Sequence, residues 1–239
     1  MSRIWTLSWM AIHEMWISFR LIAVLGLPLL GGLLAVVVPP DLVGVTAVGG
    51  AGFWYAVGAS MAIALVAGLA AGTLANERRR GTVAWMAVRA VPRASVFMSW
   101  FVAFGLLLGI GIVLGSIGAW LAALSHAEET PDPVPFAAAV GATIGVGLLA
   151  VAVGLLAGTF LPARPATALA IGVGAVTLAV AVALAPGGVP SPTGGIGLLS
   201  HLDSATRPLA DALRSAGAAL AATSIVLALG ARGLERTDL

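Results

Sequence analysis

Apolar residues occur in this chain in runs long enough to cross a lipid bilayer, and this feature limits the possible folds most strongly. Six stretches approach or exceed the roughly 20 mainly apolar residues that a transmembrane helix needs. They cover 21–38, 53–75, 95–124, 136–160, 167–185 and 215–230. Only 9% of the 239 residues are charged, whereas soluble domains have about 25%. The sequence therefore predicts an all-α integral membrane protein with six transmembrane helices in a single transmembrane domain, 1–239.

The chain contains neither Lys nor Cys, because its 12 basic residues are all Arg. A nucleotide-binding P-loop needs a Lys at the β- and γ-phosphates. Disulfide, thiolate and iron–sulfur sites need Cys, and no His-Glu-x-x-His motif or carboxylate cluster offers a metal site. We therefore expect no catalytic residue, cofactor or metal in this chain. A net charge of only +2 also gives no reason to expect a nucleic-acid partner.

The distribution of Arg predicts the orientation of the spans. With a cytoplasmic N-terminus, all Arg except Arg207 and Arg214 lie in the inner segments. Cytoplasmic loops of membrane proteins carry an excess of basic residues. We therefore expect a multi-pass protein of the cell membrane with both termini in the cytoplasm.

The N-terminal residues, 2–19, form an aromatic-rich amphipathic pattern before the first span. Apolar side chains recur every three or four residues, which is the spacing of one helix face. They are Trp5, Trp9, Ile12, Trp16 and Phe19. Trp residues on one face suit a helix in the headgroup region of a bilayer. The pattern predicts such an interfacial helix, and the alternative is a plain extension of the first span.

An arginine-rich loop, 77–93, joins the second and third predicted spans. Cations in the last turn of a helix complement its dipole and the anionic headgroups nearby. A glycine suits the left-handed position that ends a helix. The residues with these roles at the start of the loop are Glu77, Arg78, Arg79, Arg80 and Gly81. The second span is thus predicted to end abruptly at the membrane surface.

A short second helix is predicted within the same loop. Thr82 is a suitable N-cap, and Pro92 disfavours the helical conformation of the residue before it. The segment between them is apolar apart from Arg89, with Val83, Trp85, Met86, Val88 and Val91. An apolar helix outside the bilayer needs a surface to bury against, and a groove on a partner protein provides one. By charge alone, the alternative is a basic loop that only sets topology.

This loop resembles a motif in the permease subunits of ABC-2 type ABC transporters. The shared features are the Glu-Arg-Arg-Arg-Gly-Thr run at 77–82, the short apolar helix, and the Pro92-Arg93 exit into the next span. Six spans, cytoplasmic termini and an amphipathic N-terminal helix extend the resemblance over most of the chain. The chain departs from the family pattern at Ala84, where an acidic residue is usual.

The resemblance implies partners and site residues. The helix 82–91 would be a coupling helix in a cleft of a separate ABC ATPase subunit, which binds ATP and Mg²⁺, with the N-terminal helix as a connecting helix beside it. A second permease chain, identical or related, is implied because six spans are half of such a transporter. The residues implied in ATPase coupling are Glu77, Arg78, Arg79, Arg80, Gly81, Thr82, Trp85, Met86, Arg89, Pro92 and Arg93.

The predicted spans also bear on the energy source. Ion-coupled transporters place carboxylates or His inside the membrane to bind ions. The centres of the second to sixth spans contain no Asp, Glu or His, and His13, His126 and His201 all lie outside the spans. An ion-coupled cycle is therefore not expected, and the energy must come from a partner.

Small residues in the spans predict close helix packing. Gly-x-x-x-Gly spacing lets backbones approach, either within one chain or between subunits. The pairs are Gly68/Gly72, Gly105/Gly109, Gly111/Gly115, Gly141/Gly145 and Gly154/Gly158. The outer segment, 186–214, is predicted either as the short external helices that the resemblance implies or as a solvated loop.

The favoured function is a permease that exports a hydrophobic or amphipathic compound, such as a drug, an antibiotic or a lipid-like molecule. A path lined mostly by Gly, Ala, Val, Leu and Phe suits such a substrate better than a highly charged one. Three alternatives stay open at this point. They are a haem-exporter-type permease, the substrate-binding subunit of an energy-coupling-factor importer, and a non-transporting membrane anchor or immunity protein.

Overall fold

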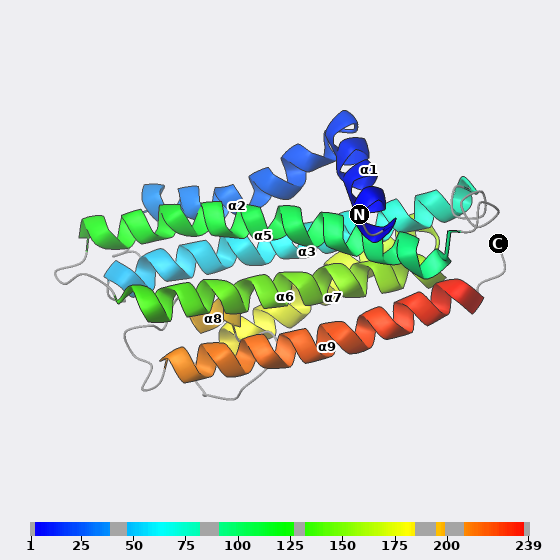
Figure 1. Cartoon of the computed structure of the whole chain (residues 1–239). Helices are drawn as coiled ribbons and strands as arrows, with labels where there is room; N and C mark the ends of the chain where they lie inside the picture. The colour runs from blue at the N-terminus through cyan, green and yellow to red at the C-terminus, as the bar shows by residue number, and fades with distance from the viewer. Residues whose placement is uncertain are drawn as a thin grey trace.

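Long helices lying side by side form the body of the protein (Figure 1). The computed structural model describes residues 3–38, 47–81, 91–126, 132–184, 195–198 and 208–236, and within these ranges it contains helices and no strands. The helices are α1 (Arg3–Ile17), α2 (Arg20–Val37), α3 (Ala47–Arg79), α5 (Arg93–His126), α6 (Pro133–Phe160), α7 (Ala163–Leu184), α8 (Gly195–Leu198) and α9 (Pro208–Arg236). The predicted all-α class is therefore confirmed for the described residues.

Several of these helices are long and apolar enough to cross a membrane. Five stretches reach this length and hydropathy: Arg20–Val37, Ala51–Arg79, Arg93–Ser125, Pro133–Phe160 and Pro208–Arg236. A shorter apolar stretch, Ala163–Val176, lies in α7. Helices of this length and composition are those of a multi-pass membrane protein. The predicted span at 167–185 falls on α7, and the count of six spans stays a prediction.

Helices α3 and α9 extend beyond the predicted spans into flanking polar residues that favour a helix. α3 continues through Glu77 to Arg79, and α9 covers Pro208–Arg236 rather than only 215–230. Glu, Arg, Leu and Ala all have high helix propensity. Hydropathy therefore locates the part of a helix that can cross lipid, whereas propensity and capping set where the helix ends.

Local features of the chain determine where α6 begins and where the helix breaks between α1 and α2. The Asp132 side chain accepts a hydrogen bond from the amide of Val134 at 2.9 Å, and Pro133 follows it at the first helical position. Phe19 has a left-handed φ of 58° between α1 and α2. This single residue lets α1 lie crosswise to the bundle while α2 runs along it (Figure 1).

The two central helices, α3 and α6, meet backbone to backbone. A methyl group at Gly154 would collide with the carbonyl oxygen of Ala67, and one at Gly158 would press on that of Ala71. Because lipid tails are as apolar as the side chains, helices in a membrane associate through such close packing. The pair Gly154/Gly158 thus joins two helices of the same chain.

The other predicted glycine pairs mostly pack within the chain as well. Gly68 and Gly72 face side chains of α7, and Gly105 and Gly109 face side chains of α6. The pair at 111 and 115 faces α2, and Gly145 faces α9. A Cβ atom at Gly141 would meet no atom within 4 Å. Packing within the chain, one of the two predicted uses of this spacing, therefore accounts for most of the pairs.

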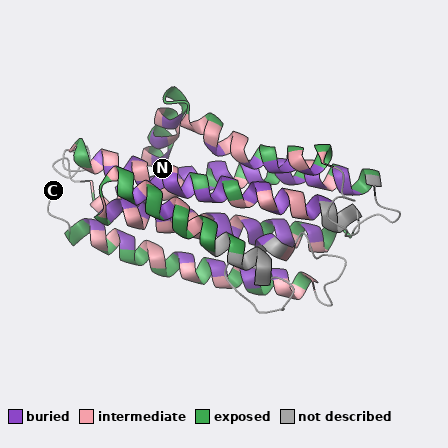
Figure 2. Ribbon diagram, turned by 180° about the vertical axis from the view of Figure 1, so that it is seen from behind, coloured by how far each residue is buried: buried purple, intermediate pink, exposed green. Residues whose placement is uncertain are grey.

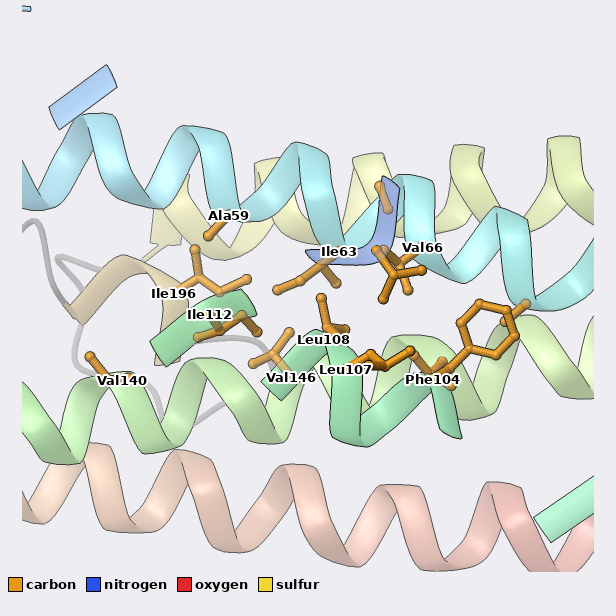
Figure 3. Close-up of a cluster of buried hydrophobic side chains, with 14 of the residues drawn as sticks. Ala59, Ile63, Val66, Phe104, Leu107, Leu108, Ile112, Val140, Val146 and Ile196 are labelled. Carbon is orange, nitrogen blue, oxygen red and sulfur yellow. The ribbon is translucent and has the colours of Figure 1, made fainter. Parts of the chain in front are cut away.

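The apolar core lies between α3, α5, α6 and α8. Figure 3 shows Ile63 of α3, Leu108 of α5, Val146 of α6 and Ile196 of α8 converging on it, and all four are buried. The Tyr55 hydroxyl of α3 donates to the carbonyl of Ile112 in α5 at 2.9 Å. A buried hydroxyl needs such a partner, since an unpaired polar group in an apolar interior is costly.

The outer helices are much less buried than the central ones. In the apolar 18-residue stretch of α3, 67% of the residues are buried, against 28% in that of α2 and 22% in that of α9. Figure 2 shows the exposed residues on the outward faces of the described helices. Many of them are large apolar residues, including Leu33 of α2 and Ile225 of α9. Such faces suit contact with lipid or with another membrane protein.

A matched pair of substitutions on α6 tests this packing. Gly154→Ala places a methyl group against the backbone of α3, whereas Gly141→Ala places the same group in open space. Overpacking of this kind costs about 1–3 kcal/mol. We expect G154A to lower the melting temperature in detergent, and G141A to leave it unchanged or to raise it slightly. Equal melting temperatures for the two variants would contradict the α3–α6 contact.

Candidate functional site at the arginine-rich end

The helix directions bring most of the described Arg residues to one end of the bundle. α2 begins, α3 ends, α5 begins and α9 ends there, next to α1 (Figure 1). The Arg residues at these helix ends are Arg20, Arg78, Arg79, Arg93 and Arg236, and Arg164 lies at the start of α7. We call this region the arginine-rich end. It also includes the described residues that were implied in ATPase coupling.

Helix α1 carries exposed Trp side chains on its outward face. Trp5, Trp9 and Trp16 are between 46% and 66% exposed, whereas Ala11 and Met15 on the other face are buried. Two members of the predicted stripe behave differently. Ile12 packs half-buried against the core, and Phe19 lies beyond the end of α1, which is at Ile17. The predicted position of this helix in the headgroup region of the membrane stays a prediction.

The end of α3 separates one buried carboxylate from exposed cations. Glu77 is only 6% exposed and belongs to the last turns of α3, whereas Arg79 and Arg80 are exposed. Gly81 has a φ of 73°, and its amide donates to the carbonyl of Arg78 at 3.0 Å. The predicted left-handed glycine at the helix end is thus confirmed. Glu77 was predicted as the first residue of the loop, but its side chain is packed inside.

Arg78 ties the end of α3 to the end of α6. Its NH1 group donates to the carbonyl oxygen of Gly158 at 3.1 Å. This carbonyl is in the last turn of α6, where carbonyl groups lack intrahelical partners and carry the negative end of the helix dipole. The next amide past the helix, that of Leu161, donates to the carbonyl of Ala157 at 2.9 Å. Arg78 therefore serves as a cationic cap that fixes two helix ends together.

A small electrostatic cluster joins α1, α2 and α3. Burial raises the pKa of Glu14 above its ordinary value, and the neighbouring carboxylate of Glu77 raises it further. Arg20 and Arg80 oppose this by lowering the pKa of Glu14. Arg20 also donates from NH1 to the Thr73 hydroxyl at 3.1 Å. The orientation of α1 is therefore coupled to the charges at the ends of α2 and α3.

The far end of the loop leads directly into the bundle. Val91 packs half-buried against the apolar core, Pro92 is exposed, and α5 begins at Arg93. The amide of Ser95 donates to the carbonyl of Pro92 at 2.9 Å, which starts the helix. Residues 82–90, including Thr82, Trp85, Met86 and Arg89, lie outside the described residues. The coupling helix predicted there therefore stays a prediction.

Two features of this end were not anticipated from the sequence. Glu14 and Glu77 are 63 positions apart in the chain, and their interaction depends on the tertiary fold, in which α1 packs against α5 and α2. Arg164 joins Arg78 and Arg79 around one groove. The only sequence signal was that all three Arg residues fell on the same predicted side of the membrane.

Among the described residues, no group of three or more His, Cys, Asp or Glu could hold a metal ion.

No protein-family model matches this chain, and no curated protein matches it in sequence.

A conservative substitution tests the cluster at Glu14. Because the pKa of Glu14 is raised, the folded state favours the protonated carboxyl group. At pH values above its unfolded pKa, near 4.5, the ionised carboxylate therefore costs folding stability. Glu14→Gln removes this cost. We expect E14Q to have a slightly higher melting temperature than the parent at pH 7, and this advantage to shrink as the pH falls toward 4.5.

The control is Glu235→Gln, which neutralises an exposed carboxylate near the end of α9. It should leave the melting temperature almost unchanged over the same pH range, because an exposed charge is screened by solvent. A lower melting temperature for E14Q at pH 7 would show that the attraction of Arg20 and Arg80 for the Glu14 carboxylate outweighs its burial, and would contradict the raised pKa of Glu14.

Proposed function

We propose that this chain is the permease subunit of an ATP-driven transporter of the ABC-2 type, in the cell membrane with both termini in the cytoplasm. The observation that carries the proposal is the loop 77–93 at the arginine-rich end. Its sequence resembles the coupling loop of that family, and its described ends belong to two long apolar helices, α3 and α5. A separate ATPase subunit would receive the segment 82–91.

The anchoring of both loop ends supports a mechanical role. On one side, Arg78 links α3 to the last turn of α6. On the other side, Val91 packs against the core just before α5 begins. Closely packed helices move as rigid bodies, because packed interfaces do not deform continuously. A displacement of the segment between these anchors would therefore be transmitted to α3, α5 and α6 together.

The charge distribution supports an external energy source. Ions that drive transport are bound by carboxylates or His within the membrane. In the described spans, the acidic residues lie near the helix ends, as Glu77 does in α3 and Asp211 does in α9. We therefore assign ATP and Mg²⁺ to the partner subunit and no cofactor to this chain. The chain itself is proposed not to be an enzyme.

The surface supports a hydrophobic or amphipathic substrate and a second permease chain. The sparse burial of α2 and α9 leaves broad apolar faces on two sides of the bundle. An apolar path between two such subunits would admit a drug-like, antibiotic or lipid-like compound and would exclude a highly charged one. Export of such a compound by a homodimer or heterodimer is the activity we propose.

The loop is tested with the pair Trp85→Asp and Met86→Asp. Two carboxylates on the apolar segment would be buried without partners in the ATPase cleft, which is strongly unfavourable. With the ATPase that co-purifies with the parent chain, we expect transport-coupled ATP hydrolysis in liposomes to fall at least about tenfold, since about 1.4 kcal/mol of lost binding corresponds to a factor of ten.

The control is the apolar pair Trp85→Phe and Met86→Leu, which keeps the hydrophobic surface and should retain coupling. Circular dichroism should show the same helicity for both double variants. Full coupling in the Asp pair, with the spans intact, would contradict the role assigned to the segment 82–91.

The energy source is tested with the purified chain alone in liposomes. Imposed proton and sodium gradients should drive no uptake of an amphipathic dye, whereas addition of the ATPase subunit with ATP and Mg²⁺ should. Gradient-driven uptake by the chain alone would exclude the ATP-dependent mechanism. It would instead require an ion site in the middle of the spans, where the sequence has no carboxylate or His to form one.

A further inference from the structure

A groove of about 700 Å³ opens at the arginine-rich end between α3 and the turn that joins α6 to α7. It is lined by Ala75, Arg78 and Arg79 of α3 and by residues 160–165. The hydroxyl of Thr167 donates to the carbonyl of Gly68 at 3.2 Å. This bond holds the first turns of α7 beside α3, so that Arg164 lies across the groove from the arginines of α3.

The groove is strongly cationic. Arg78, Arg79 and Arg164 contribute three guanidinium groups, and no acidic side chain is among the lining residues. The Nε atom of Arg78 is buried and has no hydrogen-bond partner in the described part of the chain. Guanidinium groups present planar donor pairs that match the oxygens of a phosphate. Three cations around one groove that no carboxylate lines favour an anionic ligand.

Backbone donors add to this charge. The first turn of α7 begins at Ala163, and Pro162 and Pro165 have no amide hydrogen. The amide of Ala166 already donates to the carbonyl of Pro162 at 2.9 Å. The amides of Ala163 and Arg164 are thus the first-turn donors without an intrahelical acceptor. Both residues line the groove, at the positive end of the α7 dipole.

The remaining wall of the groove is apolar. Phe160 is 58% exposed although it ends a helix that is otherwise well packed, and Leu161 and Ala75 line the groove beside it. The groove therefore combines phosphate-binding donors with an apolar surface, at the ends of helices that cross a membrane. A ligand with an anionic head and an apolar tail matches both parts, whereas a small inorganic anion matches only the first.

We propose that this groove binds the phosphate of an anionic phospholipid headgroup. The three guanidinium groups and the first-turn amides of α7 hold the phosphate, while Phe160 and Leu161 contact the start of the acyl chains. The bound lipid bridges α3 and α7 at the end where the loop 77–93 begins. Arg78 and Arg79 also belong to the loop proposed to couple to an ATPase, but every group of this site lies in this chain, so lipid binding is measured without the ATPase subunit.

The full-length chain in detergent provides the test, by native mass spectrometry with added phosphatidylglycerol or phosphatidylcholine. The groove variant is Arg79→Gln with Arg164→Gln. The control is Arg232→Gln with Arg236→Gln, which removes the same charge from exposed positions at the same end, outside the groove. We expect the groove variant to bind phosphatidylglycerol roughly 30-fold more weakly, as two lost contacts between Arg and anionic headgroups imply. The control should bind it as the parent does.

Three results would overturn the proposal. The first is equal phosphatidylglycerol binding by the groove variant and the parent, with unchanged helicity by circular dichroism. The second is equal retention of phosphatidylcholine and phosphatidylglycerol by the parent, which would show that the groove does not select for charge. The third is displacement of the lipid by millimolar inorganic phosphate, which would assign the groove to a soluble phosphate rather than to a lipid.

Discussion

Backbone contact between α3 and α6 is the interaction on which the rest of the bundle depends. Glycines 154 and 158 bring α6 onto the carbonyls of Ala67 and Ala71, and α3 also packs against α2, α5 and α7. In lipid, the hydrophobic effect does not drive helices together, so short-range packing must do it. A backbone that comes this close leaves no room for side chains at the contact. The small residues of α3 and α6 are therefore a condition for the fold.

The arginine-rich end follows from this packing. Because α3 and α6 are held side by side, their ends meet, and Arg78 can cap the carbonyl of Gly158. The start of α7 is held against α3 in the same way by Thr167, which places Arg164 near the arginines of α3. Charged groups are too costly for the apolar middle of the bundle. They gather where the helices end, beside α1 and the loop 77–93, so that one end of a rigid bundle presents a concentrated positive charge.

The sequence predicted the helices well and the contacts between them poorly. Long apolar runs and the lack of charge located the helices, and Gly81 marked a helix end that the structure has. Hydropathy could not find the polar extensions of α3 and α9, because Glu and Arg continue a helix as readily as Leu does. The meeting of Glu14 with Glu77 and the groove around Arg164 depend on how distant segments fold together, and no local pattern records that. The short helix in the loop was predicted from Thr82, Pro92 and the apolar residues between them, and its coupling role came from the resemblance. Residues 82–90 lie outside the described residues, so both stay predictions.

Site-specific crosslinking tests the proposed coupling most directly, because the chain has no Cys and a single introduced thiol is unique. Trp85→Cys would carry a maleimide–benzophenone reagent in the segment 82–91, with Leu121→Cys, an exposed residue near the opposite end of α5, as the control. With the co-purifying ATPase and ATP, irradiation should join the ATPase to the chain labelled at 85 and not to the chain labelled at 121. No adduct from position 85, or equal adducts from both positions, would contradict the coupling of this loop to an ATPase.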